Sequence, residues 1–193
     1  MKKEKDGKMN KSGIGFYSIR MFIWSLAYRI MCLIVSTSLV AILNNKLGVI
    51  LAQMFCLGII LVLPYLRIFD VGFNDYNRIN YGHIKRDELK GLKIGLIVSV
   101  PYILCSVALI LARFSIVPPI YLSIFRMINS PYFSLCQTLL PSTLTITEQS
   151  LFAVIVMALT VFTEPVVYAL GYRMGLARIS FTEQMGLRKP RDK

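Results

Sequence analysis

The side chains best suited to chemistry in this chain are two opposite charges, Arg29 and Glu164, each inside a long apolar run. Charges within membrane spans are costly, so they are usually paired or functional. Counted inward from the nearer ends of their runs, both lie on the order of 10 Å deep, at 1.5 Å per helical residue. Their similar depth predicts an ion pair. The alternatives are an Arg29 that extends to the headgroups and a Glu164 that handles a proton or substrate.

Small residues recur at every fourth position in two of the apolar runs, which places them on one face of a helix. Such faces allow another membrane helix to approach closely. We therefore expect two helix-packing faces. One consists of Gly48, Ala52 and Cys56, and the other of Gly91, Gly95 and Ser99.

Other groups that could do chemistry are sparse. His83 is the only histidine and no Cys-x-x-Cys occurs, so the sequence predicts no metal site and no cofactor. The segment Asn74–Asn77 resembles a calcium loop only in composition, and it lacks the spaced acids and closing glutamate of an EF-hand. We expect a solvated turn there. No common nucleophile or phosphate-binding motif occurs.

Four apolar runs must position these residues. They span residues 23–43, 47–69, 92–112 and 150–172, and apolar residues make up 55% of the chain. About 20 helical residues cross a ~30 Å hydrocarbon core, and each run has about that length. The sequence predicts an all-α bundle of four transmembrane helices, with the first run retained as a span rather than removed as a signal.

The basic residues predict the orientation. Six Lys and Arg residues precede the first run, six lie between Arg67 and Lys93, and six follow Tyr172, whereas the two other connections hold three. Because positive charge accumulates on the cytoplasmic side, we expect a plasma-membrane protein with both termini in the cytoplasm. The formal net charge of +12 indicates contact with anionic inner-leaflet lipid and no nucleic-acid partner.

Four segments flank or join the spans. Residues 1–20 and 173–193 are basic tails, and residues 70–91 form a cytoplasmic loop. The outer segment 113–149 is nearly uncharged, and prolines divide it into pieces of about ten residues. Its candidate helices, Pro119–Ile128 and Tyr132–Leu140, predict an interfacial or re-entrant segment. Two further spans are the alternative.

The sequence favours a non-enzymatic function. Faces of small residues and few polar groups suit an accessory or scaffold subunit of a bacterial inner-membrane complex, with lipids, other membrane subunits or a second copy as partners. The first alternative is a subunit that transports or binds a small solute, with Glu164 and the outer segment forming its site. The second is an intramembrane enzyme.

Overall fold

The computed structural model describes residues 13–43, 46–118, 120–141 and 144–178, and within these ranges every regular element is a helix. The predicted all-α bundle is confirmed. The elements are α1 (Ile14–Leu43), α2 (Lys46–Asn80), α3 (Lys90–Arg113), α4 (Tyr121–Ile128), η1 (Ser130–Tyr132), α5 (Phe133–Leu139), α6 (Leu151–Leu159), η2 (Thr160–Phe162) and α7 (Thr163–Leu176).

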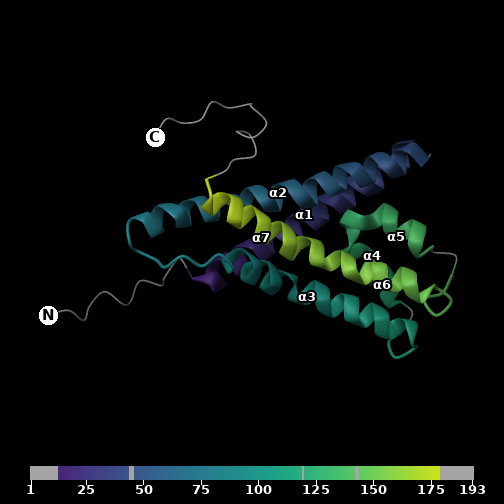
Figure 1. The fold of residues 1–193 in the computed structure, drawn as a ribbon. Coiled ribbons are helices and arrows are strands. Elements are labelled where there is room, and N and C mark those ends of the chain that lie inside the picture. The colour runs from purple at the N-terminus through teal and green to yellow at the C-terminus, as the bar shows by residue number, and fades with distance from the viewer. Residues whose placement is uncertain (1–12, 44–45, 119, 142–143, 179–193) are drawn as a thin grey trace.

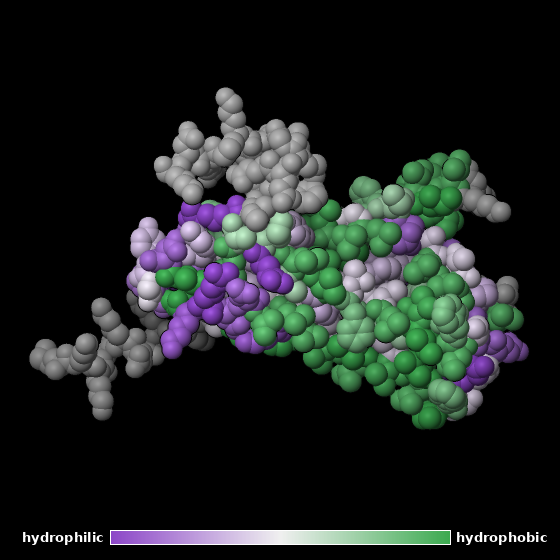
Figure 2. Space-filling model, in the orientation of Figure 1, coloured by the Kyte–Doolittle hydropathy of each residue, from purple (hydrophilic) through white to green (hydrophobic). Residues whose placement is uncertain are grey.

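Four of the described helices are long and apolar enough to cross a membrane. They are Ile14–Leu43, Leu47–Asn80, Lys90–Arg113 and Leu151–Leu176, the last comprising α6, η2 and α7. The chain is therefore a multi-pass membrane protein. α4 and α5 have eight and seven residues, well short of the ~20 needed to span, so the six-span alternative is wrong. Apolar side chains cover most of the visible surface away from one polar end (Figure 2).

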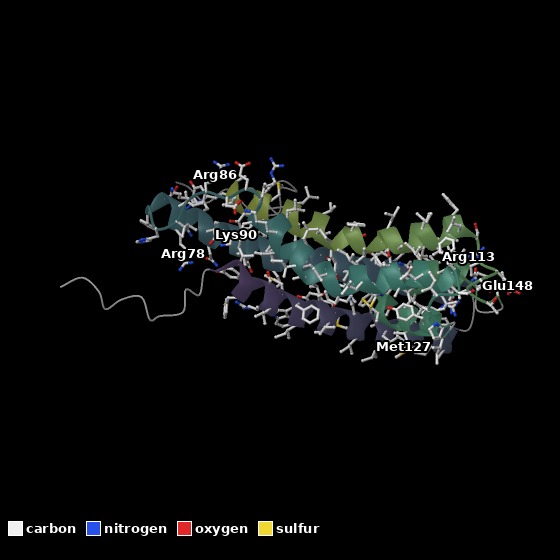
Figure 3. The ribbon with its side chains drawn as sticks, turned by 90° about the horizontal axis from the view of Figure 1, so that it is seen from below. Arg78, Arg86, Lys90, Arg113, Met127 and Glu148 are labelled. Atoms are coloured by element: carbon white, nitrogen blue, oxygen red, sulfur yellow. The ribbon has the colours of Figure 1, made fainter. Side chains whose placement is uncertain are left out.

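That polar end, called here the basic end, is where α1 begins, residues 81–89 join α2 to α3, and α7 ends (Figure 1). Arg78, Arg86 and Lys90 lie at the basic end, whereas Arg113 and Glu148 lie at the opposite end (Figure 3). Toward that opposite end α1 and α2 diverge from α3 and α6. The space between the two pairs holds α4 and α5 (Figure 1).

Helix α7 packs between α2 and α3 through glycines that bring the backbones close. A Cβ on Gly91 would lie 2.4 Å from the Cβ of Tyr172, and one on Gly95 would lie 2.8 Å from the Cα of Pro165. On the other side of α7, a Cβ on Gly175 would lie 2.3 Å from the Phe69 carbonyl oxygen. The small-residue face of α3 therefore packs on α7, and Ser99 on that face is fully buried.

The small-residue face of α2 packs on α1. Ala52 and Cys56 are buried, and the Cys56 thiol donates to the Cys32 carbonyl oxygen at 3.5 Å. A Cβ on Gly48 would lie 2.8 Å from the Leu43 Cβ, so this glycine permits the close turn between the two helices. Both predicted faces thus lie at helix–helix contacts.

The helices extend beyond the predicted spans. α2 continues to Asn80, so the predicted loop 70–91 reduces to residues 81–89, and the turn expected at 74–77 is wrong. The physical reason is burial: Asp75 is fully buried against other helices, which stabilises the additional turns. Similarly, α1 begins at Ile14, inside the predicted N-terminal tail, and α7 ends at Leu176. The rest of both predicted tails, residues 1–12 and 179–193, lies outside the described residues.

Candidate functional site

Arg29 and Glu164 form a buried ion pair between α1 and α7. The Arg29 Nη2 lies 2.7 Å from the Glu164 Oε1, and the two side chains are only 5% and 2% exposed. The structure thus brings the two predicted residues together, and Arg29 does not extend to a headgroup region. Burial removes both charges from solvent, so each group depends on the other for compensation.

Two further side chains complete the pair's polar surroundings. Ser25, one turn before Arg29 on α1, places its hydroxyl 3.0 Å from the Glu164 Oε1 and 3.2 Å from the Tyr102 hydroxyl. The Arg29 guanidinium carbon lies 3.6 Å from the centre of the Tyr102 ring, close enough for a cation–π contact. The site therefore joins α1, α3 and α7.

The outer segment folds back to reach this site. The Arg29 Nη1 donates to the Ile128 carbonyl oxygen at 2.9 Å, and the Ser130 hydroxyl donates to the Arg29 carbonyl oxygen at 2.7 Å. On α2, the Gln53 side chain donates to the Pro131 carbonyl oxygen and accepts from the Ser134 amide, each at 3.1 Å. α4, η1 and α5 therefore form a re-entrant hairpin, with its tip at η1 against α1 and α2.

The charged pair lies halfway along its helices. Arg29 follows the first residue of α1 by 15 positions and precedes the last by 14. Tyr102 is 12 and 11 positions from the ends of α3, and Glu164 is 13 and 12 positions from the ends of Leu151–Leu176. The sequence placed both charges near one end of their spans because the predicted spans began late and ended early. Within the bundle, both charges lie near the middle of their helices.

Glu164 lies just after a point where its helix changes from 3₁₀ to α-helical geometry. The 3₁₀ turn η2 separates α6 from α7 and ends two residues before Glu164. Pro165 follows directly; it has no N–H to donate to the preceding turn, which accounts for the irregularity. Glu164 lies in the first turn of α7.

A groove of about 360 Å³ opens beside the pair, between α1, α3 and the end of α4. Nearly all its lining is apolar, and the polar exceptions include Arg29 and Tyr102. The lining residues are Phe22, Leu26, Arg29, Ile30, Leu33, Pro101, Tyr102, Cys105, Met127 and Ile128.

A second buried polar cluster lies nearer the basic end. Asp75 on α2 accepts from the Lys90 Nζ at 2.6 Å and from the Tyr172 hydroxyl at 2.9 Å. The Lys90 Nζ also lies 5.0 Å from the centre of the Tyr17 ring. This cluster joins all four spans. Outside it, the Lys93 ammonium donates to Asp87 at 2.8 Å and lowers the pKa of that carboxyl below its usual value.

The sequence predicted the Arg29–Glu164 pair but not the groups that surround it, and it did not predict the Asp75 cluster. The apolar spacing Ile68, Val71 and Ile79 continues the period of α2 past its predicted end, and it is the signal that could have placed Asp75 on a helix. Among the described residues no group of three His, Cys, Asp or Glu side chains could hold a metal ion. No family model, curated protein or solved structure matches this chain.

Proposed function

We propose that this chain is a non-enzymatic accessory or scaffold subunit of a larger complex in the bacterial inner membrane. The observation that supports this proposal is that the buried charges pair between different spans. Arg29–Glu164 joins α1 to α7, and Lys90–Asp75 joins α3 to α2. Each buried ion pair connects two different spans, so both pairs act as fixed links within the bundle.

The glycine contacts support the same proposal. α7 approaches α2 and α3 so closely that an added Cβ on Gly91 or Gly175 would overlap its neighbour. Gln53 binds the re-entrant hairpin to α2 with both its amide nitrogen and its amide oxygen. Such packing favours one rigid arrangement of spans, which suits a subunit that presents fixed surfaces to its partners.

We propose that the membrane is the plasma membrane and that the basic end faces the cytoplasm. The three segments richest in Lys and Arg adjoin the start of α1, the 81–89 connection and the end of α7, which all lie at the basic end. Anionic lipids of the inner leaflet are then its immediate partners.

Partner contacts would form on the helix faces that the bundle leaves open. On α2, Met54 and Val62 are 67% and 51% exposed, and nothing lies within 4 Å of a Cβ built on Gly58 between them. The test is a photo-crosslinking scan in native membranes, with a benzophenone side chain at exposed positions of α1, α2 and α3. A subunit should yield the same heterologous adduct from neighbouring positions on one helix face.

Adducts with a second copy of this chain at such a face would instead establish a homo-oligomeric scaffold. The absence of any protein adduct across all three helices would contradict the subunit role. Buried positions such as Val98 serve as the matched control, because a benzophenone there should react only within the chain.

A solute-transport subunit is the second candidate, and the winding change at η2 beside Glu164 favours it. Transporter helices are commonly interrupted next to the residues that bind substrate or a coupling ion. Proton flux into vesicles with the purified chain tests this candidate. Flux that Glu164→Gln abolishes supports transport, whereas equal leakage from empty vesicles and from vesicles with the chain argues against it.

A further inference from the structure

A tryptophan and an arginine stack where α1 and α2 meet near the basic end. The guanidinium carbon of Arg67 on α2 lies 4.1 Å from the centre of the Trp24 ring on α1, and the Trp24 and Tyr28 rings stack with centres 5.9 Å apart. Trp24 packs against residues that join the two helices, among them Cys32 and Cys56. Because a stacked guanidinium lies flat against the ring, its N–H donors lie along the edges of that plane.

These donors have no acceptor in the described part of the chain. Arg67 makes no hydrogen bond and no ion pair there, whereas Lys90, Lys93 and Arg86 near the same end each contact a carboxylate. Arg20 on α1 likewise has neither a hydrogen bond nor a carboxylate partner among the described residues. A guanidinium presents five N–H donors in a geometry that suits carboxylate or phosphate. Both side chains are therefore able to bind an external anion.

Arg20 and Arg67 lie at the same level of the antiparallel pair α1 and α2. The Cys32 and Cys56 thiols each donate to the other residue's carbonyl oxygen, which aligns the two helices. Toward the basic end, Arg20 is 12 residues from Cys32 and Arg67 is 11 residues from Cys56. At 1.5 Å per residue the two arginines differ by only about 2 Å in height. Trp24 is one turn from Arg20 on the same face of α1. The three residues form one surface, called here the arginine patch.

The arginine patch lies where the hydrocarbon of a membrane would end. The 20 residues from Leu47 to Leu66 contain no charged side chain, and Arg67 follows them directly. Twenty helical residues cover ~30 Å, the thickness of the hydrocarbon core. Leu66 beside Arg67 and Ile23 beside Trp24 are exposed, so in a membrane they face lipid chains. The arginine patch is therefore open to lipid at the level of the headgroups.

The charge of the arginine patch favours an anionic headgroup. Arg20 and Arg67 supply two positive charges, and Asp70, three positions after Arg67, supplies one negative charge. The local excess is therefore one positive charge. A lipid phosphate carries one negative charge, and its oxygens accept from guanidinium groups. A zwitterionic headgroup would add an ammonium group beside the arginines, whereas the uncharged glycerol of phosphatidylglycerol leaves the charges balanced.

We propose that the arginine patch binds the headgroup of one anionic phospholipid of the phosphatidylglycerol type. The phosphate accepts hydrogen bonds from Arg67 and Arg20, and the acyl chains lie along Ile23 and Leu66. The inference rests on the proposed contact with anionic lipid and narrows it to one site. It does not depend on the orientation of the basic end or on a partner subunit.

The single tryptophan of the chain provides the readout, because Arg67 lies on the Trp24 ring. The full chain is reconstituted in phosphatidylcholine vesicles that contain a rising fraction of phosphatidylglycerol with brominated acyl chains, which quench tryptophan fluorescence on contact. Brominated phosphatidylcholine at the same fractions measures the quenching by lipid that exchanges without preference. We expect half-maximal quenching at an about tenfold lower fraction of phosphatidylglycerol, a preference of ~1.4 kcal/mol. Equal quenching curves for the two lipids would overturn the proposal.

Two matched variants locate the site. Arg67→Gln removes the stacked guanidinium, whereas Arg173→Gln removes an equal charge from an exposed position of α7 near the same end. We expect Arg67→Gln to leave less than an about twofold preference for phosphatidylglycerol, and Arg173→Gln to stay within about twofold of the wild type. Thermal unfolding curves show whether both bundles are intact. Equal losses in the two variants would indicate general attraction by the basic end and would contradict a defined site.

A third variant tests the patch without disturbing the Trp24 stack. Arg20 is exposed, so Arg20→Gln should fold like the wild type, and we expect it to weaken the preference by about threefold or more, the size expected for one hydrogen bond to a charged group. An unchanged preference would rule out a phosphate held by both arginines. Recovery of fluorescence in millimolar inorganic phosphate would assign the patch to a soluble phosphate and overturn the lipid proposal. An inverted topology or the absence of a partner subunit would leave these results unchanged, because both leaflets of the vesicles contain the lipid.

Discussion

The Arg29 guanidinium lies 2.7 Å from the Glu164 carboxylate across 135 residues of sequence, and each group stands at the midpoint of its span. The contact joins the first span to the last. The re-entrant hairpin adds the Ile128 carbonyl oxygen to the same guanidinium, so one side chain connects three separate parts of the chain.

Breaking the central pair on one side should destabilise the bundle strongly. Arg29→Met leaves Glu164 buried without its cation, and Glu164→Gln leaves Arg29 buried without its anion. We expect each substitution to lower the free energy of unfolding by about 3–5 kcal/mol. The double variant should cost less than the sum. Reversible unfolding by SDS in mixed micelles measures the cycle. Coupling near zero would contradict the pair, and the exposed pair Arg86–Glu88 is the control, with coupling of at most about 1 kcal/mol.

The buried Asp75 should contribute about as much to the free energy of unfolding as the Arg29–Glu164 pair. Asp75→Asn removes the anion that Lys90 and Tyr172 share, and we expect a loss of about 3 kcal/mol or more, because the buried Lys90 ammonium then loses the carboxylate that it contacts. Asp70→Asn, five positions earlier on the exposed side of α2, should change the free energy of unfolding by less than about 0.5 kcal/mol. Equal effects of the two substitutions would show that the buried cluster does not stabilise the fold.

Glycines at close contacts should not tolerate even one methyl group. A Cβ at residue 175 would lie 2.3 Å from the Phe69 carbonyl oxygen, so we expect Gly175→Ala to cost about 1–3 kcal/mol through forced separation of α2 and α7. Gly58→Ala is the matched control, with nothing within 4 Å of the new Cβ, and it should stabilise α2 by about 0.5–1 kcal/mol. Thermal unfolding in the same detergent compares them. A stabilising Gly175→Ala would rule out the close contact.

Cys136 should be nearly inert at neutral pH. Its side chain is fully buried in the hairpin, so a maleimide has no access to its thiol. The purified protein is treated with N-ethylmaleimide at pH 8, and labelling is read by peptide mass spectrometry. Cysteine introduced by Gln137→Cys, at the exposed neighbouring position, should react within minutes. Equal rates at both positions would show that the hairpin does not bury residue 136.

The proposed orientation predicts opposite labelling at the two ends. Arg86→Cys lies at the basic end and Glu148→Cys at the other, and both positions are exposed. In intact cells a membrane-impermeant maleimide should label Glu148→Cys at once and Arg86→Cys only after permeabilisation. Labelling after detergent extraction checks that both thiols can react. The reverse order would invert the topology, and the groove and ion pair at mid-span would be unaffected.

The sequence by itself predicted much of the fold, because length and apolarity of a run report directly on its ability to span hydrocarbon. It also predicted the candidate helices on either side of Pro131, close to the observed α4 and α5. The boundaries were wrong where helices leave the apolar run. Asp75 shows why: polarity ends a hydropathy signal, but a buried partner such as Lys90 keeps a polar residue inside a helix bundle.

What the sequence determined is therefore local: four spans, two faces of small residues, and the isolated charges Arg29 and Glu164, whose cost in lipid marks them without any knowledge of the fold. Only the tertiary structure decided which further groups contact those two charges. Ser25, Tyr102 and the Ile128 carbonyl oxygen come from three different elements, and no spacing along the chain relates them. Helix packing brings them together, because contacts distant in sequence depend on how the spans are arranged and not on the pattern within any one span.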